Sequence, residues 1–379
     1  MQGVISGAIN PVFDSAGTDC RRECSMKLIR TEDAVGHVLC HDITQIIRGV
    51  TKDAVFRKGH VVQEEDIPVL LSVGKEHLYV WERREDMLHE DEAALILYEI
   101  CVGSHMHASE IKEGKIELIA DCDGLLKIDS ERLHAINTVG EMMIATRHGN
   151  TIVRKGDKLA GTRVIPLIIE KARMERARGI AETYREKNGG VPMLDVKPFI
   201  HKKVGIVTTG SEVYHGRIQD TFTPVILDKL AEFDTEVIGQ KICDDDPAGI
   251  TDAILEWIAE GAELVICTGG MSVDPDDRTP LAIRNACTGS GIEPTGSVVS
   301  YGAPVLPGAM FLLAYNGCGI PVVGLPGCVM YAKRTIFDLI LPRLMADERL
   351  TAHDINCLGE GGLCLSCEIC TYPNCGFGK

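Results

Sequence analysis

Three short loops, each preceded by an apolar run, place the strongest constraint on how this chain of 379 residues can fold. The runs cover residues 204–207, 264–266 and 320–323 and are rich in β-branched residues, as strands buried on both faces require. Helical patterns lie between the runs, so the strands are expected to be parallel. The fold class that we predict is α/β, with a doubly wound and mostly parallel sheet preceded by smaller α+β domains.

The loops that follow these runs contain the residues from which we expect a binding site. In a parallel sheet the loops at the carboxyl ends of the strands converge on one crevice, where ligands bind. Small residues there leave backbone N–H groups accessible to an anionic ligand, and acidic residues can hold a metal ion or position a reacting group. The predicted ligand-binding residues are Thr209, Gly210, Ser211, Thr268, Gly269, Gly270, Ser272, Asp276, Thr279, Pro326 and Gly327.

These loops resemble the molybdopterin-binding domain shared by the proteins of molybdenum cofactor biosynthesis. The resemblance covers about residues 203–345. The first loop, residues 210–224 with Asp220, is similar to that of the molybdopterin adenylyltransferases. The second loop is similar to theirs in the Thr-Gly-Gly of residues 268–270 and the Asp-Arg-Thr-Pro of residues 277–280.

Other parts of the loops are similar to other branches of the family. The Met-Ser-Val of residues 271–273 and the Gly-Leu-Pro-Gly of residues 324–327 are similar to the molybdenumtransferases. Residues 276–279 resemble the competence-damage-inducible family, which acts on nucleotide pyrophosphates. Asp274 and Cys328 replace the Gly and the Asn of the molybdenumtransferase branch, and the N-terminal half lacks a counterpart of the acidic active-site loop found in that branch.

The resemblance implies that molybdopterin, or its adenylylated or molybdenum form, is the ligand or substrate. It further implies adenylyl or molybdenum transfer in cofactor biosynthesis, with Asp220 and Asp277 as the catalytic residues, ATP as a co-substrate and Mg²⁺ between the phosphates. Such transfer depends on positioning and charge neutralisation, for which Asp274, Asp276 and Asp277 offer oxygen ligands. Two alternatives stay open: a non-catalytic molybdopterin carrier or sensor, and a nucleotide-pyrophosphate hydrolase.

Each acidic residue in these loops also has a purely structural interpretation. Asp220 precedes a helix expected to begin near residues 221–224 and is a favourable helix cap. Asp277 precedes Thr279 and Pro280, which are typical of the cap and the first turn of a helix. The acidic turn at residues 244–246 would likewise be favourable at a helix N-terminus.

The bulk properties restrict the partners of the chain. Its formal net charge of −16 argues against nucleic acid or an anionic membrane, because a basic stripe is needed to neutralise phosphates. The sequence contains no apolar run of the length that spans a membrane. The first residues lack the pattern of a secretory signal, so a cytoplasmic protein is expected. A second copy of the chain or a molybdoenzyme is the expected macromolecular partner.

Composition and turn signals divide the chain into six segments. We predict a disordered extension (1–25), a small α+β segment (26–90), an α+β domain (91–170), a helical linker (171–194), the molybdopterin-binding α/β domain (195–347) and a Cys-rich metal-binding tail (348–379). Within the second α+β domain, residues 115–123 and 164–169 are each predicted to form one strand.

The tail contains an unusual concentration of thiols. Of the 15 cysteines in the chain, Cys364, Cys367, Cys370 and Cys375 lie within twelve residues, and Cys357 lies seven residues upstream. Gaps of two residues let neighbouring thiolates converge on one metal, which predicts a Zn²⁺ site or a [4Fe–4S] cluster. Cys357 is a substitute ligand in this hypothesis. Because the tail is too short to bury a core of its own, we expect its folding to depend on the metal.

Overall fold

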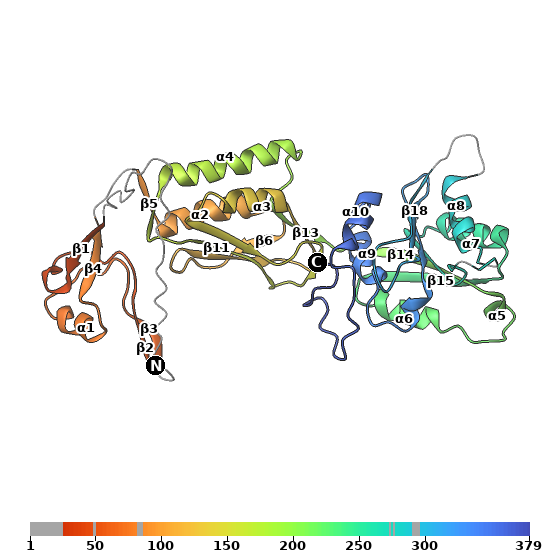
Figure 1. Cartoon of the computed structure of the whole chain (residues 1–379), viewed down its shortest axis with the longest axis horizontal. Helices are drawn as coiled ribbons and strands as arrows, with labels where there is room; N and C mark the ends of the chain where they lie inside the picture. Colours follow the sequence, from red (N-terminus) through yellow and green to blue (C-terminus); the bar gives the residue numbers. More distant parts are fainter. Residues whose placement is uncertain (1–25, 48–50, 82–85, 273, 276, 290–295) are drawn as a thin grey trace, which may run out of the picture.

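The computed structural model describes residues 26–47, 51–81, 86–272, 274–275, 277–289 and 296–379. The predicted disordered extension (1–25) and the predicted ligand-binding Asp276 lie outside these residues. Three lobes follow one another along the long axis of the molecule, in the order of the sequence (Figure 1). We call them the N-terminal lobe (26–81), the middle domain (86–198) and the C-terminal domain (199–379).

The N-terminal lobe consists of two antiparallel strand pairs and one short helix. Its core contains Ala34, Leu39, Ile43, Val62, Leu70 and Leu78. Strand β1 pairs with β4, and β2 pairs with β3. The elements are β1 Met26–Arg30, η1 Thr31–Asp33, β2 Ile43–Ile47, β3 Thr51–Phe56, α1 Asp66–Ser72 and β4 His77–Trp81.

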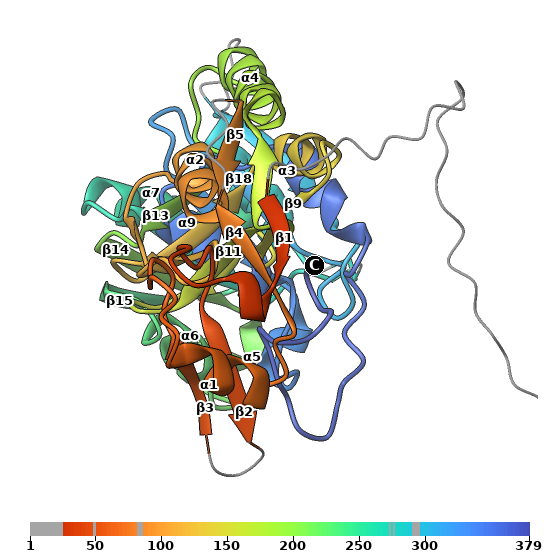
Figure 2. The ribbon, with the colours of Figure 1, turned by 90° about the vertical axis from the view of Figure 1, so that its left-hand side faces the viewer.

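The middle domain packs helices α2, α3 and α4 on antiparallel sheets of order β6-β7-β11-β9 and β10-β8-β13. The three helices lie on one side of these sheets in both Figure 1 and Figure 2. The elements are β5 Met87–His89, α2 Glu90–Cys101, β6 Met106–Ala108, β7 Lys115–Ala120, β8 Gly124–Ile128, α3 Ser130–Asn137, β9 Met142–Thr146, β10 Thr151–Val153, β11 Lys158–Val164, β12 Ile168–Glu170, α4 Lys171–Lys187 and β13 Leu194–Pro198.

Two strand predictions in this domain are wrong in extent. The predicted strand 164–169 is divided into the end of β11 and β12, and Pro166, which has no N–H for a ladder, lies in the gap. The predicted strand 115–123 ends at Ala120 and resumes as β8 at Gly124. The intervening Asp-Cys-Asp forms a bend, and the Asp121 N–H donates to the carbonyl oxygen of His105, the residue just before β6.

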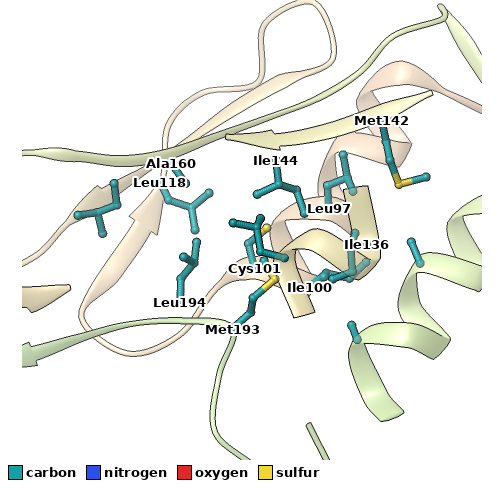
Figure 3. Packing of buried hydrophobic residues seen from close by; sticks show 14 of the residues in the cluster. Leu97, Ile100, Cys101, Leu118, Ile136, Met142, Ile144, Ala160, Met193 and Leu194 are labelled. Atoms are coloured by element: carbon teal, nitrogen blue, oxygen red, sulfur yellow. The ribbon is translucent and has the colours of Figure 1, made fainter. Parts of the chain in front are cut away.

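The stretch predicted as a linker contains α4, which contributes to the core of the middle domain. Met174, Ala177 and Ala181 are buried in the same cluster as residues of α2 and the sheets. Figure 3 shows this cluster from close by, with Leu97 and Cys101 of α2 among the sheet residues. Because β13 also pairs with β8, the middle domain extends to Pro198.

The C-terminal domain confirms the predicted doubly wound sheet. Its strand order is β15-β14-β16-β19-β18-β17; the first four strands are parallel to one another, and β18 is antiparallel to both of its neighbours, β19 and β17. The elements are β14 Lys202–Thr209, α5 Ser211–Tyr214, α6 Phe222–Leu230, β15 Thr235–Cys243, α7 Pro247–Ala259, β16 Leu264–Thr268, α8 Thr279–Thr288, β17 Ser297–Tyr301, β18 Leu312–Tyr315, β19 Pro321–Leu325, η2 Gly327–Met330, α9 Ile336–Met345, α10 Ala352–Asn356 and η3 Cys357–Gly359.

Helices cover both faces of this sheet. Along β16, Leu264 and Ile266 face the cluster that contains α6 and α9, whereas Val265 and Cys267 face the cluster that contains α7 and α8. This alternation is the period of two expected for a strand, and both faces are apolar because both are covered. In the described part of the chain, none of the helices has the length and apolar character needed to cross a membrane.

Candidate functional site

The register of the parallel strands brings the three predicted loops side by side. Thr208 of β14 pairs with Thr268 of β16, which in turn pairs with Leu325 of β19. From β14 the chain continues to β15 on one side and returns to β16 on the other. The strand order therefore reverses at β14, and the carboxyl edge between β14 and β16 is the switch point where doubly wound sheets bind ligands.

Buried threonine hydroxyls connect the first and second loops. Thr209 Oγ1 lies 3.0 Å from Thr279 Oγ1, and both side chains are almost completely buried. The backbone N–H of Thr279 donates to Gly270 O at 3.2 Å, which fixes the second loop against the start of α8. The helix itself begins at Thr279, with Arg278 at the cap position. The hydroxyl of Thr279 thus serves the contact between loops, and its predicted capping role is wrong.

Two glycines of the second loop allow this close approach. Both have positive φ, 83° at Gly269 and 53° at Gly270. A Cβ atom on Gly269 would lie 2.2 Å from Thr209 O, and one on Gly270 would lie 2.8 Å from Thr279 Oγ1. A side chain at either position would force the two loops apart.

Asp220 is held by the protein on both carboxylate oxygens. Its Oδ1 accepts from the N–H groups of Phe222 at 2.8 Å and Thr223 at 3.3 Å, the first two residues of α6, while Thr221 is at the cap position. Its Oδ2 accepts from Gln240 Nε2 at 2.6 Å. Burial alone would raise the pKa of Asp220, but the hydrogen bonds from Thr223, Phe222 and Gln240 lower that pKa below its usual value. Asp220 is therefore ionised at neutral pH.

Sequence reasoning missed the residues that surround Asp220. Gln240 Nε2 lies 2.8 Å from both Thr208 Oγ1 and Thr223 Oγ1, so one amide joins β15, β14 and α6. The available signal was a long polar side chain near the carboxyl end of a strand. Its partners are 17 and 32 residues away in sequence, and no local spacing reveals such contacts.

The acidic turn after β15 supports the first loop and α7. Asp245 Oδ2 accepts from the N–H of Ser211 at 2.9 Å, at the start of α5. Asp246 Oδ2 accepts from the N–H of Gly249 at 2.9 Å and caps α7. The predicted structural role at the start of the following helix is confirmed for Asp246, whereas Asp245 accepts at the start of α5 instead.

The second loop carries its other polar residues at the surface. Asp277 is half-buried, and its Oδ2 accepts from the N–H of Asp274 at 3.2 Å. Asp274 and Ser272 are exposed. These carboxylates are of the hard oxygen type that Mg²⁺ prefers. Across the residues that the structure describes, no three His, Cys, Asp or Glu side chains are grouped closely enough to hold a metal ion.

The third loop lies against the other two. Pro326 is buried, and Gly327, with open space around its Cα, begins η2. Gly324 of β19 lies against Met271 of the second loop, with 2.6 Å between Met271 Sδ and the place of a Cβ. Thr221 of the first loop donates to Met330 Sδ at 3.3 Å. The ligand-binding residues predicted in all three loops, with Asp276 outside the description, therefore lie along one edge of the sheet.

Two segments of the chain match known domain families. Residues 205–346 match the family described as a probable molybdopterin binding domain. Residues 28–82 match a domain of unknown function, DUF8806.

Curated relatives match over a short segment. A CinA-like protein of Mycobacterium sp. strain MCS is 39% identical over 85 residues, which are 22% of this chain and 20% of that protein. A CinA-like protein of Mycobacterium tuberculosis strain H37Rv is 39% identical over 89 residues, 23% of this chain and 20% of that protein. The match thus spans about a fifth of the length of these relatives.

Two solved structures that are similar to this chain each cover less than half of it. The molybdopterin biosynthesis enzyme MoaB from Thermus thermophilus has 23% identity and a TM-score of 0.31, covering 39% of this chain and 98% of that one. The tungsten cofactor synthesizing protein MoaB from Pyrococcus furiosus has 21% identity and a TM-score of 0.30, covering 38% of this chain and 91% of that one.

Proposed function

Because residues 205–346 belong to the molybdopterin-binding domain family, we propose that this protein binds molybdopterin, or its adenylylated or molybdenum form, and acts in molybdenum cofactor biosynthesis. The observation that carries this proposal is the convergence of the first and second loops at the switch point, where Thr209 Oγ1 lies 3.0 Å from Thr279 Oγ1 and Gly269 and Gly270 allow the close approach. This arrangement leaves small, hydrogen-bonding loops at the edge where an anionic pterin phosphate would bind.

The catalytic form of the proposal is Mg²⁺-dependent adenylyl or molybdenum transfer. In adenylyl transfer, a phosphate oxygen of the pterin attacks the α-phosphorus of ATP and pyrophosphate leaves. Bound Mg²⁺ would neutralise phosphate charge, and Asp277 with its neighbour Asp274 offers carboxylate ligands at the loop surface. Asp220 would act differently, because Gln240 and the start of α6 already occupy its oxygens. Its proposed role is to hold the first loop and orient Gln240.

Binding is tested directly by titrating the purified chain with molybdopterin and following pterin fluorescence. We expect saturable binding that Gly270→Asp abolishes, since the new side chain would separate the first and second loops. Gly261→Asp is the matched control, because Gly261 also has a positive φ, 94°, but has no atom within 4 Å of its Cβ position. The proposed site is refuted if the unchanged protein shows no saturable binding, or if the Gly270→Asp variant binds molybdopterin equally well.

A second assay distinguishes adenylyl transfer, pyrophosphate hydrolysis and pterin binding without either activity. Incubation with molybdopterin and Mg-ATP yields adenylylated pterin from a transferase, whereas incubation with ADP-ribose yields cleaved dinucleotide from a pyrophosphate hydrolase. A carrier or sensor yields neither product but still binds the pterin. For a transferase, we expect Asp277→Asn to slow product formation on the order of 10²-fold. Asp252→Asn, which removes a carboxylate of α7, should leave the rate unchanged.

A further inference from the structure

Four cysteines of the tail line one hollow of about 960 Å³ at the surface of the C-terminal domain. They are Cys364, Cys367, Cys370 and Cys375, and all are free thiols. Cys357 does not line this hollow; its Sγ lies 3.4 Å from His353 Nε2 on α10. The four closely spaced cysteines thus line one hollow, and the fifth lies outside it.

Both ends of the cysteine loop are anchored to the domain. At its start, Cys364 N–H donates to Leu306 O at 2.8 Å, next to a bridge between Leu306 and Leu363. At its end, Phe377 is buried in the core that contains α9. Cys364 and Cys375 are partly buried against the same core. Two of the four thiols are therefore held in place independently of any ligand.

The middle of the cysteine loop, residues 367–370, which we call the crest, is hydrogen-bonded to the segment that follows η2. Lys333 Nζ donates to Glu368 O at 2.7 Å. Tyr372 donates its hydroxyl hydrogen to Asp338 O at 3.0 Å, and its ring lies 4.9 Å from the guanidinium carbon of Arg334. These contacts arch the chain between the anchored ends, so that Cys367 and Cys370 line the same hollow as the two anchored thiols.

The loop is short of apolar packing of its own. Leu363 is 63% exposed, and Leu365 and Ile369 are each 79% exposed. A loop whose apolar side chains point to solvent needs another source of cohesion, which metal ligation supplies in small cysteine-rich segments. The wall of the hollow also contains Lys333, whose positive charge would offset part of the negative charge of a thiolate-bound centre. The neighbouring Arg334 is already paired with Asp338 and Glu232.

We propose that Cys364, Cys367, Cys370 and Cys375 together bind one metal centre per chain through their thiolates. The spacing and the shared hollow fit either a single Zn²⁺ or a [4Fe–4S] cluster, since both are bound by four thiolates. Among the described residues no three such side chains lie close enough together to hold a metal ion, so binding would require the exposed thiols of Cys367 and Cys370 to move inward. This site is separate from the pterin loops and uses none of their residues.

Metal content is the direct test, measured on the full chain after anaerobic purification. One zinc per chain in a colourless protein identifies a zinc site. About four irons with as much sulfide, and a broad absorption band near roughly 400 nm, identify a cluster. The double variant Cys367→Ser/Cys370→Ser changes two exposed crest thiols and should bind the metal at least about tenfold more weakly. The matched variant Cys318→Ser changes an exposed cysteine outside the hollow and should keep the metal.

The proposal is overturned by absence of both metals, by metal retained in the crest variant, or by equal loss in the matched variant. Intramolecular disulfides found in the metal-free chain by thiol titration under argon would overturn it as well. Molybdopterin titration of the crest variant keeps the two proposals apart. We expect pterin binding to survive loss of the metal, so failure of one site leaves the other measurable.

Discussion

Trp257 of α7 packs against the sheet at positions where the strands carry glycine. Gly205 of β14 lies so close to Trp257 that a Cβ atom would lie 2.5 Å from the indole Cγ. The indole is fixed, because its Nε1 donates to Ile206 O at 3.0 Å and Lys241 Nζ lies 4.2 Å from its ring centroid. We therefore expect Gly205→Ala to lower the free energy of unfolding by about 1–3 kcal/mol.

A glycine outside the core serves as the control for this prediction. Gly179 is an exposed residue of α4 with no atom within 4 Å of its Cβ position, so Gly179→Ala should raise the free energy of unfolding by about 0.5–1 kcal/mol. Urea denaturation of both variants measures the two changes. If Gly205→Ala were as stable as the unchanged protein, Trp257 would have to be mobile in its pocket.

The residues of the candidate site differ in how visible they are in the sequence. Gly269 and Gly270 follow an apolar run directly, and their conformational freedom is a local property that a motif reveals. Gln240 and Thr223 take part in the site only because β15, β14 and α6 meet in space. Their roles depend on strand register and helix placement, which residue spacing does not encode.

At the scale of single elements, α10 depends on a carboxylate that serves two partners. Asp354 Oδ2 accepts from the N–H of Thr351 at 2.8 Å and completes the capping box, and Asp354 Oδ1 accepts from Arg343 Nη2 at 2.7 Å. Burial alone would raise the pKa of Asp354, but the hydrogen bonds from Thr351 and Arg343 lower that pKa from 3.8 to about 2. The folded state therefore holds the ionised form more tightly than the unfolded state does.

A pH series with Asp354→Asn tests this assignment. A depressed folded pKa contributes stability that is present above pH 3.8 and is lost as pH falls toward about 2. Asp354→Asn should consequently be less stable than the unchanged protein at pH 5 to 7, roughly, with the difference shrinking below about pH 4. Thermal midpoints of the two proteins across this range give the measurement. A difference that stays constant down to low pH would contradict the role of the charge.

The elements of the C-terminal domain were predictable because the local sequence pattern of each one favours the structure that it adopts in the fold. Runs such as 264–266 are apolar on both faces, and two of the helices between them have a proline in the first turn, Pro247 and Pro280, which indicates where each helix starts. In the middle domain, β8, β10 and β13 form one sheet from segments far apart in sequence. Short strands of this kind have weak local patterns, and a charged helix such as α4 shows its three buried residues only once its partners are known.

At the scale of the whole molecule, a largely buried ion-pair network joins the middle and C-terminal domains. Lys127 of β8 donates from Nζ to Glu348 Oε1 at 2.8 Å, and Arg343 of α9 donates to both Glu348 oxygens at 2.9 and 3.1 Å. Burial lowers the pKa of Lys127, whereas the hydrogen bonds from Arg343 and Lys127 outweigh burial and lower the pKa of Glu348. The two domains have separate cores, so this network is expected to couple their unfolding.

A double-mutant cycle measures that coupling. Lys127→Met and Glu348→Gln should each lower the free energy of unfolding. The loss in the double variant should be smaller than the sum of the two single losses by about 0.5–3 kcal/mol, because both substitutions remove the same contact. Lys127→Met combined with Glu256→Gln on α7 is the control and should be additive within about 0.5 kcal/mol. Additivity of the first pair would mean that the domains unfold without help from this contact. Calorimetry of Lys127→Met gives a second measurement. If the contact couples the domains, their two thermal transitions should lie farther apart in the variant than in the unchanged protein. If it does not, the separation between the transitions should be unchanged.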